Sequence, residues 1–128
     1  MHDFKGQTVI VTGGTRGIGR SIAESFLKAG ARVIVTYSSN EAAAAKFEQE
    51  SSQYAGAIEV QKCDVSKYKD VENFFEYADK KYGGFEVLVN NAGIRKDAVL
   101  AHVLLQREGL TMSSSVTANS RNSSVPRG

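Results

Sequence analysis

Thr12-Gly13-Gly14-Thr15-Arg16-Gly17-Ile18-Gly19 is a glycine-rich stretch that follows the apolar run 9–11 and precedes apolar residues at helical spacing. Glycine adopts a positive φ without strain and lets the backbone come close to a ligand. A helix beginning at Gly17 would direct free N–H groups and its positive dipole end toward a diphosphate. The stretch therefore predicts a nucleotide-phosphate site between a first strand and a first helix.

The rest of the chain alternates short apolar runs with helical patterns. Strands are predicted over 7–12, 32–36, 58–63 and 85–90. Helices are predicted over 17–29, 41–53, from an N-cap at Ser66 to the Gly83-Gly84 pair, and over 97–107. Strands joined through helical crossovers run parallel, so this order predicts an α/β fold with a doubly wound parallel sheet.

The composition changes after residue 110. Residues 111–128 hold six serines, two threonines and two asparagines, with no acidic residue and no apolar periodicity. Such a segment buries too little apolar surface to offset its ordering entropy. We expect a folded half domain over 1–110 and a disordered serine-rich tail over 111–128.

Charge and cysteine content exclude several classes of protein. The formal net charge is +2, and the whole surplus comes from Arg121 and Arg127 in the tail, so no basic surface predicts nucleic-acid binding. Cys63 is the only cysteine, which excludes an internal disulfide and fits a reducing compartment. The chain begins without a signal-peptide pattern and has no run of membrane-spanning length. These features predict a cytoplasmic protein with no membrane partner.

Three polar or small-residue stretches follow predicted strands. They are 12–19 after the first strand, Asp64-Val65 after the third, and Asn90-Asn91-Ala92-Gly93 after the fourth. Doubly wound sheets bind their ligands outside the carboxyl ends of the strands. One glycine turn alone is weak evidence, but three such stretches at one edge favour a ligand site there.

In combination, these motifs resemble those of the short-chain dehydrogenase/reductase family. Residues 12–19 and 90–97 resemble most the 3-oxoacyl-(acyl-carrier-protein) reductases, and the likeness covers roughly residues 4–102. The resemblance implies a Rossmann-like sheet, here incomplete, with about four strands in the order 3-2-1-4. It also implies these cofactor contacts: Gly13, Gly14, Thr15, Arg16, Gly17, Ile18 and Gly19 at the diphosphate, Asp64 and Val65 at the adenine, and Asn90, Asn91, Ala92 and Gly93 at the sheet end and adenosine ribose.

The end of the second strand indicates which dinucleotide is bound. An NAD site places a carboxylate there for the ribose 2′-hydroxyl, but this chain has Thr36-Tyr37-Ser38-Ser39. Arg16 could pair with a 2′-phosphate through a charge-assisted contact, with Tyr37 and Ser38 beside it. NADP(H) is the predicted cofactor, and the alternative for Arg16 is a solvated turn residue.

The catalytic residues that the resemblance implies are not found. The family uses a serine, a tyrosine and a lysine four residues after the tyrosine, all beyond the Asn-Asn-Ala-Gly motif. No tyrosine follows Gly93, and the last lysine is Lys96. Tyr77 and Lys81 match the tyrosine–lysine spacing but precede the fourth strand, so we interpret them as a chance surface pair. No catalytic residue and no metal site is assigned, since His2 and His102 lack partners at ligand spacing, and Cys63 is expected to be a small buried hydrophobe.

Two hypotheses remain open from the sequence. The first is an NADP-binding fragment of a truncated short-chain oxidoreductase, inactive alone, whose parent reduces a 3-oxoacyl thioester in fatty acid biosynthesis and meets an acyl carrier protein only as a full-length enzyme. The second is a non-catalytic nucleotide-binding module that acts through a partner. In both, the apolar edge of the fourth strand would be open and would favour self-association.

Overall fold

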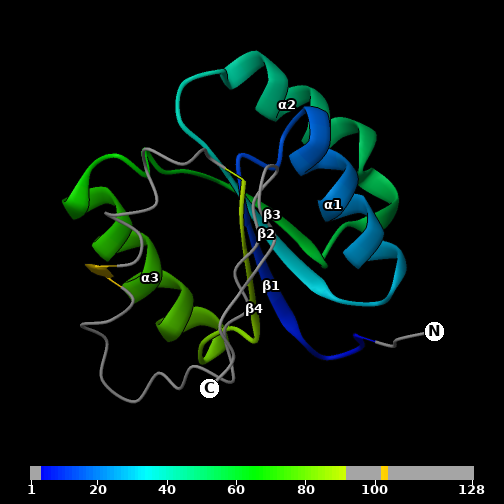
Figure 1. Cartoon of the computed structure of the whole chain (residues 1–128). Coiled ribbons are helices and arrows are strands. Elements are labelled where there is room, and N and C mark those ends of the chain that lie inside the picture. The colour runs from blue at the N-terminus through cyan, green and yellow to red at the C-terminus, as the bar shows by residue number, and fades with distance from the viewer. Residues whose placement is uncertain (1–3, 92–101, 104–128) are drawn as a thin grey trace.

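The computed structural model describes residues 4–91 and 102–103 (Figure 1). The predicted helix over 97–107, apart from the helical pair His102 and Val103, lies outside the described residues. The predicted disordered tail over 111–128 and the predicted cofactor residues Ala92 and Gly93 also lie outside them.

Four parallel strands form one sheet in the order β3-β2-β1-β4, which confirms the predicted Rossmann-like topology. The strands are β1 (Thr8–Thr12), β2 (Arg32–Tyr37), β3 (Ile58–Lys62) and β4 (Val87–Asn90). In the register of β1, Thr12 lies between Thr36 of β2 and Asn90 of β4. The predicted polar segments are therefore brought to the same edge of the sheet.

Helices cover both faces of the sheet (Figure 1). Helices α1 (Gly17–Lys28) and α2 (Glu41–Glu50) lie on one side, and α3 (Tyr68–Tyr82) lies on the other. A short 3-10 turn, η1 (Ser52–Tyr54), follows α2, so the second helix ends earlier than predicted. The alternation of strand and helix thus produces two hydrophobic layers separated by the sheet.

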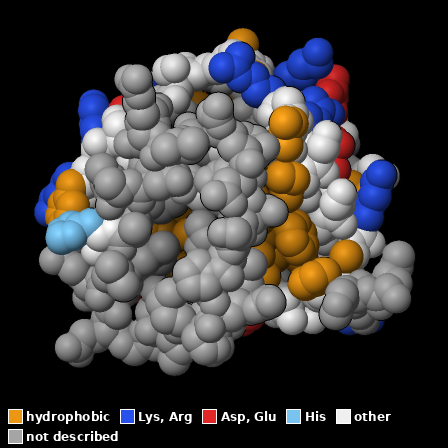
Figure 2. Space-filling view, in the orientation of Figure 1, with side chains coloured by type: hydrophobic (Ala, Val, Ile, Leu, Met, Phe, Trp, Pro, Cys, Tyr) orange, Lys and Arg blue, Asp and Glu red, His pale blue; other side chains and the backbone are white. Residues whose placement is uncertain are grey.

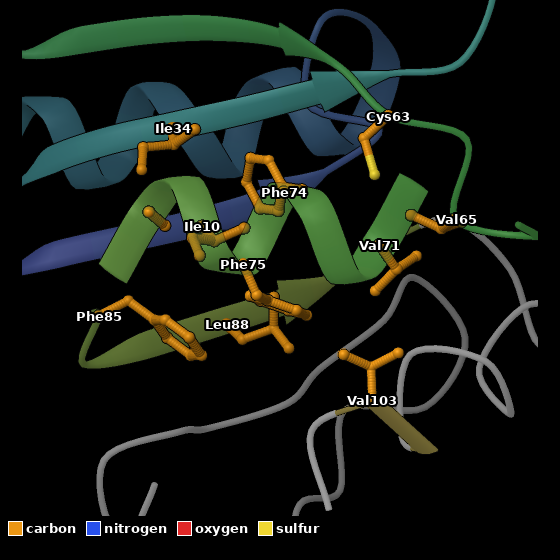
Figure 3. Close-up of a cluster of buried hydrophobic side chains, with 11 residues drawn as sticks. Ile10, Ile34, Cys63, Val65, Val71, Phe74, Phe75, Phe85, Leu88 and Val103 are labelled. Atoms are coloured by element: carbon orange, nitrogen blue, oxygen red, sulfur yellow. The ribbon is translucent and has the colours of Figure 1, made fainter. Parts of the chain in front are cut away.

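Each layer takes alternate residues of the strands, because neighbouring side chains of a strand point to opposite faces. On the α3 side, Phe74 and Phe75 point toward Ile10, Ile34 and Leu88 of the sheet (Figure 3). On the other side, the valines of β1 and β2 pack with Leu27 of α1 and Phe47 of α2. Every residue of β1 is buried, as expected for a strand with neighbours on both edges and helices on both faces.

The start of α3 differs from the prediction. Ser66 is not its N-cap: the helix begins at Tyr68, and Lys67 precedes it in extended conformation with no side-chain cap. The Ser66 hydroxyl instead donates to Asp64 Oδ1 at 2.6 Å, and the Ser66 N–H donates to the same oxygen at 2.9 Å. Because the Ser66 side chain is hydrogen-bonded within this local turn, it does not cap the helix.

Candidate functional site

An open pocket of about 470 Å³ lies at the carboxyl edge of the sheet. It lies where the glycine turn and the segments that follow β2, β3 and β4 converge. Eight of the predicted site residues line it, together with two that the sequence did not assign to a site, Thr36 and Cys63. The full lining is Gly13, Arg16, Gly17, Ile18, Thr36, Tyr37, Ser38, Cys63, Val65 and Asn91.

The four glycines of the turn have two different roles. Gly13 and Gly17 line the pocket with φ of +65° and +61°, a left-handed conformation that other residues adopt only with strain. Gly14 and Gly19 are in close contact with protein instead. A Cβ at Gly14 would lie 2.7 Å from Val35 Cγ1, and one at Gly19 would lie 2.2 Å from the Gly13 carbonyl oxygen. These two glycines allow the turn to fold against β2 and against itself.

The N-terminus of α1 faces this pocket. Arg16 is the N-cap residue, its backbone is extended, and its side chain makes no capping hydrogen bond. The first turn of α1 also contains no acidic residue. The first N–H groups of a helix have no intrahelical acceptor, so they and the helix dipole are available to an anion. Arg16 itself is exposed and adds a positive charge at the same place.

The end of β4 is joined to the glycine turn by hydrogen bonds. The Asn91 N–H donates to Thr12 Oγ1 at 2.8 Å, and the Thr12 hydroxyl donates to Asn90 Oδ1 at 3.1 Å. The Asn91 side-chain amide donates to the Gly13 carbonyl at 3.2 Å. Asn90 is buried and is not among the residues that line the pocket, whereas Asn91 lines it. The two asparagines therefore hold the glycine-rich turn in position against the end of β4.

Asp64 and Val65, expected together at the adenine, occupy different positions. Val65 is buried and lines the pocket. Asp64 lines a neighbouring cleft of about 540 Å³, which the end of β3 and the start of α3 form and which shares Ser38 with the pocket. Thr15 is buried and lines neither of them. The pocket and the cleft thus meet at the end of β2.

Thr36 and Cys63 are the pocket residues that sequence reasoning missed. The Thr36 carbonyl accepts from the Gly14 N–H at 3.2 Å, which ties the glycine turn to β2. Cys63 follows β3 and is buried, as predicted. Burial, with repulsion from Asp70 and Asp64, raises the pKa of the Cys63 thiol to about 12. The thiol therefore stays protonated at neutral pH and contributes an apolar surface to the pocket. Thr36 and Cys63 lie at the ends of predicted strands, and this position is the feature of the sequence that could have identified them as pocket residues.

Tyr77 and Lys81 are more than a chance surface pair. Lys81 Nζ lies 3.2 Å from the Tyr77 hydroxyl and 3.0 Å from Glu59 Oε1 of β3, and the hydroxyls of Tyr77 and Tyr82 also donate to Glu59. Burial raises the pKa of Glu59, but these hydrogen bonds and one from Gln61 outweigh burial and lower the pKa to about 2. The network anchors α3 to the edge strand and does not line the pocket.

The described residues contain neither a metal cluster nor a membrane-spanning helix. Within residues 4–91 and 102–103, no three His, Cys, Asp or Glu side chains gather as metal ligands would. None of the helices in this part of the chain is long and apolar enough to cross a membrane. The ring centroid of His102, which was assigned to no metal site, lies 5.5 Å from that of Tyr68.

Known proteins resemble this chain in sequence and in structure. The family model for short chain dehydrogenase matches residues 7–119. A 3beta-hydroxysteroid dehydrogenase 2 of Eggerthella lenta is 44% identical over 89 residues, 70% of this chain and 34% of that protein. The L-rhamnose 1-dehydrogenase (NADP(+)) of Thermoplasma acidophilum is 38% identical over 94 residues, 73% of this chain and 37% of that protein.

A solved structure agrees with these matches. A metagenomic short-chain oxidoreductase in complex with NADP superimposes with a TM-score of 0.69 and 28% identity, over 78% of this chain and 55% of that one. The chain spans about a third of the length of the two curated relatives. With a family match over most of its residues and the sheet order described above, the chain belongs to the short-chain dehydrogenase family.

Proposed function

We propose that this chain holds NADP(H) as the cofactor-binding part of a short-chain oxidoreductase. One observation carries the proposal: the uncapped N-terminus of α1, with Arg16 as its N-cap residue, lines a pocket that also contains the end of β2. An anion is favoured at that terminus, and the exposed guanidinium supplies a second anchor for phosphate. Family membership supports a nicotinamide dinucleotide, and an NADP-dependent relative and an NADP complex support the phosphorylated form.

The pocket offers groups suited to each part of such a cofactor. The diphosphate fits at Gly13 and Gly17, which have no side chains, next to the N-terminus of α1, whose N-cap residue makes no side-chain capping hydrogen bond. The adenosine end fits toward Tyr37, Ser38 and Val65, and none of the described residues that line the pocket carries a carboxylate. When bound, the cofactor supplies or accepts a hydride.

The remaining expected contacts belong to the same proposal. Thr15, Gly14 and Gly19 would act by shaping the turn around the diphosphate. Ile18, 58% exposed at the pocket, would shield the cofactor from water. Asp64 would approach the adenine from the neighbouring cleft, and Asn90, Asn91, Ala92 and Gly93 would border the ribose.

For the substrate, we propose a 3-oxoacyl thioester, which the whole protein would take from an acyl carrier protein. The support is the likeness of residues 12–19 and 90–97 to that reductase type. The relatives described above are named for a steroid and a sugar, so similar cofactor-binding parts serve different substrates. The substrate is therefore tested separately from the cofactor.

Titration of the full chain with NADPH and with NADH, followed by nicotinamide fluorescence, tests the cofactor. We expect NADPH to bind at least about tenfold more tightly, a difference of about 1.4 kcal/mol that one charge-assisted contact can supply. Equal affinities, or tighter NADH binding, would contradict the preference for NADP(H). Failure of both cofactors to bind would contradict the proposed function itself.

Oxidation of NADPH in the presence of a 3-oxoacyl thioester tests the substrate. The longest protein encoded at the locus is assayed, with a 3-keto steroid and a sugar lactone as controls. Turnover of the thioester alone supports the proposal, whereas turnover of a control compound would replace the substrate class. Cofactor binding without turnover of any carbonyl compound would favour the non-catalytic module.

A further inference from the structure

Lys62, at the end of the edge strand β3, lies next to the proposed adenosine end of the pocket. We propose that Lys62 is a second residue that selects NADP(H), through the 2′-phosphate, and that Glu41 holds its ammonium group in place until the cofactor binds. This inference rests on the proposed function. Lys62 lies outside the glycine-rich turn and outside the end of β2.

The register of the sheet places Lys62 at this position. Lys62 is the direct partner of Tyr37 across the β2–β3 pair, and the next residue, Cys63, donates its N–H to the Tyr37 carbonyl at 2.9 Å. Directly paired residues of neighbouring strands point to the same face of the sheet. Ser38, which follows Tyr37, lines both the pocket and the cleft to which Lys62 belongs. A phosphate at Tyr37 and Ser38 would therefore lie near Arg16, which lines the pocket, and near Lys62, which lines the cleft.

Glu41 is held close to the same turn. Its N–H donates to the Ser39 carbonyl at 2.9 Å, and its carboxylate accepts from Lys62 Nζ at 3.2 Å. The N-terminus of α2 is already capped, because Asn40 Oδ1 accepts from the Ala43 N–H at 2.9 Å. The N–H groups of Glu41 and Ala43 at the start of α2 thus already have acceptors, so an anion at this turn would be met by side-chain cations, among them the ammonium group of Lys62.

The ion pair between Lys62 and Glu41 is weak enough for a bound phosphate to replace Glu41. The side chains of Lys62 and Glu41 are 58% and 68% exposed, and ion pairs this exposed contribute little because water and salt screen them. A phosphate monoester carries between about 1.5 and 2 negative charges at neutral pH, against one on a carboxylate. The 2′-phosphate therefore competes with Glu41 for Lys62, whereas the 2′-hydroxyl of NADH does not.

The substitution Lys62→Gln tests the role of the lysine. We expect NADPH to bind about three- to tenfold more weakly, the range for loss of one exposed charge-assisted contact, and NADH to bind as in the wild type. The matched control is Lys69→Gln, since Lys69 forms a similarly exposed ion pair with Glu72 on α3, 3.6 Å apart, and lines neither the pocket nor the cleft. Unchanged NADPH affinity in Lys62→Gln, or an equal loss for both cofactors, would overturn the inference.

The substitution Glu41→Gln tests the competition, with Glu72→Gln as its control. Removing the competing carboxylate should tighten NADPH binding about two- to fivefold and leave NADH binding unchanged. Weaker NADH binding in Glu41→Gln would mean that Glu41 holds the ribose 2′-hydroxyl, and this would overturn the inference. If the wild type binds neither cofactor, the proposed function and the inference both fail. If it binds NADPH and the lysine and glutamate variants do not respond as expected, the inference alone fails.

Discussion

Gly17 and Gly6 share a conformation but differ in surroundings. Both have a positive φ, +61° and +81°, and a Cβ at either would meet no protein atom within 4 Å. Alanine at either position should therefore cost a similar backbone strain, about 1–2 kcal/mol. Only Gly17 lines the pocket, so Gly17→Ala should also weaken NADPH binding by about tenfold, and Gly6→Ala should not. Thermal unfolding and NADPH titration of both variants measure the two effects, and equal losses of affinity would contradict the role assigned to Gly17.

Glu59 is the residue whose charge should make stability depend on pH. Its pKa is about 2 in the folded chain and about 4.3 when unfolded, so the carboxylate stabilises the fold above about pH 5. That stabilisation is lost as the pH falls from about 5 to about 2, because the unfolded chain binds the proton first. We expect Glu59→Gln to lower the free energy of unfolding by about 1–2 kcal/mol at pH 7 and by less at pH 3.

Chemical denaturation at the two pH values measures this difference. Glu72→Gln, which removes an exposed carboxylate of α3, serves as the control. A loss of stability in Glu59→Gln that is the same at pH 7 and pH 3 would show that packing, and not charge, accounts for the effect.

At the scale of the elements, the sequence predicted the four strands of the described residues and the helices α1, α2 and α3. Short apolar runs indicated β1, β2 and β4, alternation indicated β3, apolar residues at helical spacing indicated α1 and α3, and the alanine run indicated α2. The boundaries were less predictable where side chains bond locally, as Ser66 does with Asp64 at the start of α3. The polar segments that follow the strands also predicted the edge of the sheet at which the pocket lies. Asp64 lies outside that pocket because of the path that the chain takes after β3. The spacing of residues in the sequence does not determine that path.

Helix α2 depends on one large side chain. Its buried residues are Ala44 and Phe47, and Phe47 is fully buried. Phe47→Ala should lower the free energy of unfolding by about 3–5 kcal/mol. It should also weaken NADPH binding, since α2 begins at the turn that carries Ser38. Phe26→Ala on α1, where the ring is only partly buried, is the comparison and should cost less. Denaturant unfolding measures both, and equal costs would contradict the anchoring role of Phe47.

At the scale of the molecule, the two edges of the sheet differ in character. In the described part of the chain, β4 pairs with β1 alone and is apolar over Val87–Val89. The opposite edge strand, β3, alternates polar residues and is anchored to α3 through Glu59. Figure 2 shows hydrophobic side chains in a vertical band on the right of the view, on the side where Figure 1 shows α1. An apolar, unpaired edge favours pairing with another chain.

We therefore expect the isolated chain to associate through β4, and a charge on that strand to prevent it. Val87 and Ile58 form a matched pair, because each is the partly buried first residue of an edge strand and packs against the same hydrophobic layer. Val87→Lys should shift the chain toward monomer in sedimentation velocity, since lysine blocks edge pairing while its stem still covers apolar surface. Ile58→Lys should leave association unchanged, with circular dichroism confirming that both variants are folded. A wild-type chain that stays monomeric as its concentration rises, or equal effects of the two substitutions, would contradict association at β4.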